Sequence, residues 1–203
     1  MNLTYDNQTN QNVVSNNGSV GAICGTMETG STLNLTYKEA NSEYSITSTN
    51  GSAGGLVGEM KGTANLNIKE MTAASQNKSV ISTAETNGYA GGLVGDMVST
   101  ASITMDSTFK VNDQPETTIP VSGNITGVEG AGGLFGRYVN SAADFDLKDY
   151  DLQNTPTVYA QYCGGVFGVL ENNKGDSASA NTLTIKNTIS SVTLNAKSGN
   201  QTT

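Results

Sequence analysis

The sequence predicts an all-β fold: a right-handed parallel β-helix, or β-solenoid, of about five to six coils with three short strands in each. Three observations predict it. A glycine-rich phrase of six residues occurs five times in the 203 residues, short runs of alternating apolar residues follow its copies, and no stretch has helical periodicity. A repeat of 20–50 residues is typical of solenoids and propellers, and apolar alternation is typical of half-buried strands.

The glycine phrase is the strongest repeat. Residues 53–58 and 90–95 read Ala-Gly-Gly-Leu-Val-Gly, and residues 131–136 differ from them only by Phe in place of Val. Residues 163–168 and 20–25 are looser copies. In stacked coils the central apolar residues should form one internal ladder, and the last glycine leaves room beside it or adopts backbone angles closed to other residues. The residues of this structural motif are Gly54, Gly55, Leu56, Gly58, Gly91, Gly92, Leu93, Gly95, Gly132, Gly133, Leu134, Gly136, Gly164, Gly165 and Gly168.

Two further runs complete each coil. The first run comprises residues 33–37, 66–68, 103–105, 145–147 and 183–185, and the second comprises 44–46, 80–81, 119–121, 158–160 and 192–194. Turn-forming Asn, Ser and Gly lie between them. A propeller blade would need four antiparallel strands, and a leucine-rich repeat would need one strand with a helical segment. Three strands per repeat therefore favour the solenoid.

The repeat fills the whole chain, so we expect residues 1–203 to form one domain. Its coils end near Gly25, Gly58, Gly95, Gly136 and Gly168. Residues 1–5 closely copy residues 33–37, which places the start of the chain partway through a coil. Neither end carries an amphipathic helix or a charged cap, with which solenoids cover a bare end rung. We expect a slice of a longer protein, or ends that pair with other copies.

Composition excludes several classes of function. The chain has no His, which removes Ser-His-Asp catalysis and His-ligated metal sites. It has 18 acidic residues against 10 basic ones, and this net charge of −8 argues against binding nucleic acid. No apolar run approaches the ~18 residues that a membrane helix needs. We therefore expect no enzyme activity, no nucleic-acid partner and no membrane insertion in this segment.

The recurring Gly-Gly-Leu-Val-Gly sequence resembles the GLUG motif, a repeat of large bacterial surface and secreted proteins. These include adhesin-like proteins and the repeat regions of some immunoglobulin A-cleaving metallopeptidases. The resemblance extends from about Gly21 to Gly168 with flanks. It implies an extracellular location, at the bacterial cell surface or secreted, and it carries no catalytic residues. The His-Glu-x-x-His signature of the peptidases is absent because the chain has no His.

An acidic cluster with neighbouring tyrosines is the candidate binding site. The expected binding residues are Asp144, Asp146, Asp149, Tyr150 and Tyr159. Tyrosine rings stack on sugar rings, and clustered carboxylates bind calcium or serve a β-helical polysaccharide enzyme. The equivalent residues of the neighbouring coils are neutral, so the cluster is more typical of a solvated acidic edge than of a calcium or catalytic site. Calcium is the only cofactor that the sequence leaves open.

Charged residues also recur at one position of the phrase. Thr26, Glu59, Asp96, Arg137 and Val169 each follow a closing glycine, so they should stack in one column. Arg137 would relieve the repulsion between the two neighbouring carboxylates. We expect a surface charge pairing of small energetic value.

The two cysteines are predicted to be unpaired. Cys24 and Cys163 lie in the first and last copies of the phrase. Four coils at about 4.8 Å separate them by roughly 19 Å, whereas a disulfide needs Cα atoms within about 7 Å. Both are expected to act as small packing residues.

Three functions remain open on the sequence alone. The first is a non-catalytic cell-surface module, acting as an adhesin or as a stalk. The second is a fibre subunit that pairs through its end rungs, and the third is a calcium-dependent polysaccharide-active enzyme. The expected partners are a host or microbial glycan, a surface protein, or a second copy of the chain bound end to end.

Overall fold

The computed structural model describes residues 1–7, 12–39, 45–71, 79–99, 101–111, 114–115, 118–120, 123–140, 145–146, 151–153, 157–172, 183–184 and 193–196. The described residues form strands, turns and bends and contain no helix. None of them belongs to a helix able to span a membrane. Parallel sheets stack into a β-solenoid, which confirms the predicted fold class. Its handedness stays a prediction.

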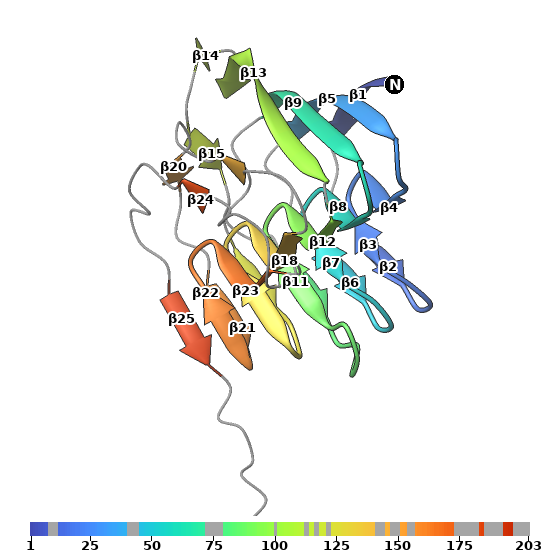
Figure 1. Ribbon diagram of the computed structural model, residues 1–203, viewed down its shortest axis with the longest axis vertical. Coiled ribbons are helices and arrows are strands. Elements are labelled where there is room, and N and C mark those ends of the chain that lie inside the picture. Colours follow the sequence, from blue (N-terminus) through green and yellow to red (C-terminus); the bar gives the residue numbers. More distant parts are fainter. Residues whose placement is uncertain are drawn as a thin grey trace, which may run out of the picture.

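The solenoid contains four long sheets, and we name them A to D in the order in which the chain visits them (Figure 1). Sheet A contains β1 (Asn2–Asn7), β5 (Thr32–Glu39), β9 (Asn65–Met71) and β13 (Ser102–Val111). Sheet B contains β2 (Val13–Ser15), β6 (Ser45–Ser48), β10 (Ser79–Ser82), β16 (Asn124–Thr126), β21 (Thr157–Ala160) and β25 (Thr193–Ala196). Sheet C contains β3 (Val20–Gly21), β7 (Ala53–Gly54), β11 (Tyr89–Gly91), β17 (Gly130–Gly132) and β22 (Tyr162–Gly164). Sheet D contains β4 (Cys24–Met27), β8 (Val57–Met60), β12 (Val94–Ser99), β18 (Phe135–Asn140) and β23 (Phe167–Asn172).

Each coil has four strands rather than the three predicted. The glycine phrase was expected to be one strand, but a bend at its centre divides it between sheets C and D. Three coils are regular, with one strand in each sheet: β1–β4, β5–β8 and β9–β12. This count is below the five to six expected, although sheets C and D continue through two further copies of the phrase.

Equivalent residues of successive coils pair in register, as the repeat predicted. Leu3 pairs with Leu35 and Tyr5 with Tyr37, so the first residues do copy the strand of the next coil. The rings of Tyr5 and Tyr37 stack with centroids 5.3 Å apart and an angle of 3° between their planes. The amide of Asn34 donates to the side-chain oxygen of Asn2 at 2.7 Å, which ties the two coils outside the core as well.

The core is a set of apolar columns along the solenoid axis. In the predicted ladder, the backbone N–H of Leu56 donates to the carbonyl of Leu93 at 2.8 Å, and Leu93 donates to Leu134 at 2.9 Å. The column two residues after the phrase is buried at Met27, Met60, Met97 and Tyr138, as expected. Leu170 ends that column and is 54% exposed, because β23 is the outermost described strand of sheet D.

The closing glycine of the phrase provides room for close packing between coils. A Cβ atom on Gly95 would lie 2.7 Å from the carbonyl oxygens of Ala53 and Gly58. Gly58 and Gly136 meet the backbone of the preceding coil in the same way. Two roles were expected for this glycine: leaving room beside the ladder, or adopting backbone angles closed to other residues. The structure supports the first of these roles.

The regular pattern changes after the third coil, where two predicted runs join other sheets. The run at residues 119–121 was expected in sheet B, but β15 (Thr118–Pro120) pairs with β20 (Asp151–Gln153), and sheet B uses Ile125 instead. Pro120 lacks the N–H that a central strand must donate. The run at 145–147 was expected between β13 and the run at 183–185. Its pairing with the run at 183–185 is confirmed, because β19 (Phe145–Asp146) pairs in parallel with β24 (Leu183–Thr184). Its expected pairing with β13 is wrong, because β13 pairs on that side with the antiparallel β14 (Gln114–Pro115).

Both cysteines are free and occupy the predicted packing positions. Cys24 pairs in register with Val57 in sheet D, and Cys163 pairs with Ala131 in sheet C. The thiol of Cys24 donates to the carbonyl of Thr26 at 3.0 Å. Partial burial raises the pKa of the Cys163 thiol, which disfavours its reactive thiolate.

Candidate functional site

The structure does not bring the five predicted binding residues together. Asp144, Asp149 and Tyr150 lie outside the described residues. The backbone of Asp146 lies in β19, whereas Tyr159 lies in β21 of sheet B with its side chain 41% exposed. The gathering of these residues into one site stays a prediction. Among the described residues, no group of three or more acidic or cysteine side chains is placed to hold a metal ion.

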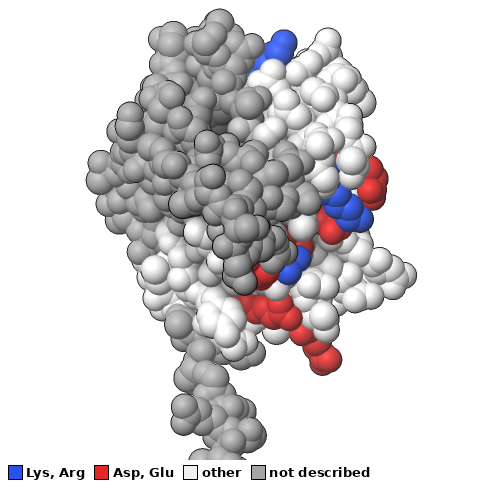
Figure 2. All heavy atoms as spheres, viewed as in Figure 1, with Lys and Arg blue, Asp and Glu red and all other residues white. Residues whose placement is uncertain are grey.

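The charged column in sheet D is the best-defined polar feature of the described residues. Its register matches the prediction: Glu59 pairs with Thr26 and Asp96, and Arg137 pairs with Asp96 and Val169. Figure 2 shows acidic and basic side chains lying next to one another in one band on this face. At one end of the band, Lys61 makes ion pairs with Glu28 at 3.3 Å and with Glu59 at 3.5 Å.

The expectation that this column is a weak surface pairing is wrong. Asp96 is only 3% exposed, and Arg137 binds it through two hydrogen bonds, from Nε at 2.9 Å and from Nη2 at 2.6 Å. The guanidinium also lies 4.5 Å from the ring centroid of Tyr89, within range of a cation–π contact. The hydrogen bonds to Asp96 raise the pKa of Arg137 further above its already high value. Asp96 and Arg137 therefore form a shielded, fixed ion pair.

A polar cavity of about 260 Å³ lies beside this ion pair. Residues of four successive coils line it: Ser19, Asn50, Gly51, Ser52, Glu59, Thr86, Asn87, Asp96 and Arg137. Most of them belong to the turns between sheets B and C, where each of the first three coils contains an Asn-Gly pair. These turn residues were not predicted as part of a site. The Asn-Gly pair that recurs just before the glycine phrase, at residues 17–18, 50–51 and 87–88, is the signal that could have found them.

Hydrogen bonds between coils fix the turns that form this cavity. Ser52 is buried; its N–H donates to the hydroxyl of Ser19 at 3.2 Å, and its own hydroxyl donates to the carbonyl of Asn87 at 3.0 Å. Asn87 adopts the left-handed region with φ of 56°, which is uncommon for a residue other than glycine. Its N–H donates to a carboxylate oxygen of Glu129 at 3.3 Å. The cavity wall is thus held in place before any ligand arrives.

Tyr89 gives this region a pH dependence at high pH. Burial, followed by a hydrogen bond with Glu129, raises the pKa of Tyr89 from 10.0 to about 12. The folded chain therefore holds this proton more tightly than the unfolded chain. The resulting stabilisation is complete below pH 10 and is lost as pH rises from 10 to 12.

We expect Tyr89→Phe, which has no hydroxyl to ionise, to reduce the dependence of stability on pH in this alkaline interval. The measurement is the urea midpoint of unfolding of both proteins at several pH values from below 10 to 12. The same loss of stability in the variant as in the original chain would contradict the role assigned to the Tyr89 proton.

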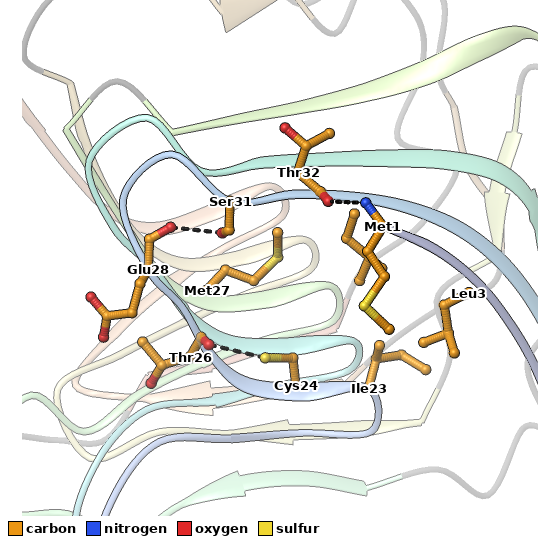
Figure 3. Close-up of a pocket in the computed structure, with 10 residues that line it drawn as sticks. Met1, Leu3, Ile23, Cys24, Thr26, Met27, Glu28, Ser31 and Thr32 are labelled. Atoms are coloured by element: carbon orange, nitrogen blue, oxygen red, sulfur yellow. Dashed lines mark hydrogen bonds between the residues drawn. The ribbon is translucent and has the colours of Figure 1, made fainter.

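A second cavity, of about 390 Å³, opens at the first coil (Figure 3). Its apolar wall is formed by Met1, Leu3, Ile23, Met27 and Leu33, with Cys24 beside them. Figure 3 shows Met1, Leu3 and Ile23 converging on this space, whereas Glu28 points away from it. The N-terminal ammonium donates to the carbonyl of Thr32 at 2.9 Å, which fixes one rim. This cavity is the open end of the apolar core.

Exposed apolar side chains are concentrated at both ends of the solenoid. Met1 and Val14 belong to the first coil, and Val14 is 59% exposed. Three of the other large exposed apolar residues of the described part lie in the outermost strands of the opposite end, Tyr162, Leu170 and Leu194, and Tyr159 lies one strand further in, in β21. The middle coils expose none of this kind among the described side chains.

Searches against protein families, curated proteins and solved structures gave no match to this chain.

Proposed function

We propose that the chain is a non-catalytic module of a bacterial cell-surface or secreted protein, acting as an adhesin or as a stalk. One observation carries this proposal: in each of the four long sheets, the strands of successive regular coils are parallel and pair in register. Such stacking makes a rod whose backbone hydrogen bonds run along its axis, with side chains presented on its long faces. The resemblance of the glycine phrase to the GLUG motif supports the extracellular setting.

The chemistry of the best-placed acid supports a role without turnover. Asp96 is only 3% exposed, and both of its carboxylate oxygens accept hydrogen bonds from Arg137, so the carboxylate is held as the partner of a fixed cation rather than presented to a substrate as a base or nucleophile would be. The chain also has no His to act as a proton carrier. A fixed ion pair of this kind suits a binding wall better than a reaction centre.

Binding of the purified chain to a broad glycan array, with and without calcium, tests this function. A discrete set of bound glycans, with no product released from them, is the result expected of an adhesin, and silence across the array is the result expected of a stalk. Product release from a polysaccharide panel, abolished by Asp146→Ala, would overturn the proposal in favour of the enzyme.

The distribution of exposed apolar residues favours a second function, and we propose it as the alternative: end-to-end assembly of copies into a fibre. Among the described residues, the four strands of the first coil are the end strands of sheets A to D, the apolar cavity opens at this coil, and the opposite end presents Tyr162, Leu170 and Leu194. A second copy of the chain fits this surface, because the outermost described strands of its opposite end, β22, β23 and β25, belong to the same parallel sheets C, D and B. A head-to-tail contact of this type does not close and therefore grows into a filament.

Light scattering over a range of concentrations tests this assembly. We expect particle mass to rise with concentration, and Val14→Lys to suppress the rise because an exposed lysine on an edge strand opposes pairing. Thr83→Lys, at an exposed position in a middle coil, adds the same charge and serves as the control. A constant monomer mass in the original chain at high concentration would rule the fibre out.

A further inference from the structure

We infer that the polar cavity beside the Asp96–Arg137 pair binds a neutral, polyhydroxylated ligand of about monosaccharide size, such as the terminal sugar of a glycan chain. This inference rests on the adhesive form of the proposed function. It gives that function a location, a ligand class and a set of residues that the sequence did not indicate.

The charges of the cavity select against ions. Glu59 and Asp96 place two carboxylates in its wall, so an anion would meet repulsion that Arg137 alone does not offset. A calcium ion needs several oxygen ligands, and at Asp96 it would be repelled by Arg137, whose guanidinium is bound to both carboxylate oxygens. A neutral ligand avoids both costs.

The hydrogen-bonding groups of the cavity match hydroxyl groups. Glu59 has one ion-pair partner, Lys61 at 3.5 Å, and keeps acceptor capacity toward the cavity. The side chains of Asn50, Thr86 and Asn87 line the cavity and have no hydrogen-bond partner among the described residues. Amide groups both donate and accept, as does a hydroxyl, so a sugar ring with several adjacent hydroxyls can satisfy them together.

The size and rigidity of the cavity fit the same ligand. Its volume of about 260 Å³ is just below the roughly 300–1,000 Å³ of sites for drug-sized molecules, which suits one sugar ring rather than a long segment. The hydrogen bonds that tie Ser52 to Ser19 and to Asn87 hold the wall across three coils. A preformed wall loses little conformational freedom on binding, which favours affinity from few contacts.

Saturation-transfer NMR of the full chain with glucose, galactose, mannose and N-acetylglucosamine, and with glucuronic acid as the anionic comparison, tests the inference. We expect transfer to at least one neutral sugar and weaker transfer to the acid. Glu59→Gln should weaken binding at least about tenfold, the usual effect of losing a hydrogen bond to a charged group. Thr86→Tyr, a bulky change at an exposed position of the rim, should abolish binding.

Glu28→Gln is the matched control. Glu28 also pairs with Lys61, at 3.3 Å, but it lies outside the cavity, so its loss should change affinity less than twofold. Sugar binding that survives both cavity variants would overturn the inference while leaving the adhesive function intact. Absence of binding to every sugar would overturn the inference, and the glycan array would then decide separately between adhesin and stalk. A preference for the acid would overturn the ligand class.

Discussion

Gly91→Ala is expected to lower the free energy of unfolding by more than about 3 kcal/mol. A methyl group at Gly91 would overlap the carbonyl oxygen of Val94 and lie 2.7 Å from Leu134 O and Gly136 N. The Val94 oxygen belongs to the backbone of the same glycine phrase, and the other two atoms belong to the backbone of the next coil, so no side-chain movement can relieve the overlap. Either the bend within the phrase or the contact between the two coils must open.

Urea unfolding followed by circular dichroism measures this effect, with Gly18→Ala as the matched control. Gly18 has no atom within 4 Å of its Cβ position, so we expect its replacement to change stability by less than about 0.5 kcal/mol. The control introduces the same methyl group elsewhere in the same solenoid. Equal unfolding midpoints for the two variants would show that the glycine phrase does not depend on close backbone packing.

Arg137→Met is expected to cost about 3–5 kcal/mol, because it leaves the buried Asp96 carboxylate without its partner. It also removes the contact between the guanidinium and the Tyr89 ring. The cost comes mainly from the stranded charge. Replacing both partners together should therefore be far less harmful than replacing Arg137 alone.

The double variant Asp96→Thr, Arg137→Val separates these causes. The same column carries Thr26 and Val169 in other coils, so both new residue types already fit this strand position. We expect the double variant to regain most of the stability lost in Arg137→Met. Urea unfolding of the double variant, of Arg137→Met and of Asp96→Thr measures this difference. A double variant no more stable than Arg137→Met would contradict the stranded-charge explanation.

The glycine phrase allowed the register of sheets C and D to be predicted residue by residue. Its leucine and glycine positions each need one kind of environment, an apolar ladder or a close backbone contact, and only one alignment of the coils satisfies both. The pairing of Cys24 with Val57, and of Cys163 with Ala131, follows from that alignment. The chemical identity of the repeated residues therefore carries the fold.

The two-residue alternation of the other runs carried less information. Many alignments bury the same apolar residues in a short strand, so residues 119–121 and 145–147 were assigned to sheets B and A, which they do not join, although the pairing of 145–147 with 183–185 was predicted correctly. The burial of Asp96 was missed for a different reason. Its column position was correct, but its shielding depends on the turns between sheets B and C and on Tyr89, which lie five or more residues away in sequence. An arginine that follows an acid in one column, as Arg137 follows Asp96, is the sequence signal for a fixed pair.

The in-register pairing of equivalent coils has a consequence for how such a chain can change in length. Each coil has equivalent strands at the same positions as the coils on either side of it. A gene duplication of one repeat would therefore insert a coil whose two contact surfaces already match those of its neighbours. Each insertion would lengthen the rod by about 4.8 Å, the spacing between paired strands. Unequal recombination between near-identical copies such as residues 53–58 and 90–95 can thus adjust reach in fixed steps without inventing a new interface.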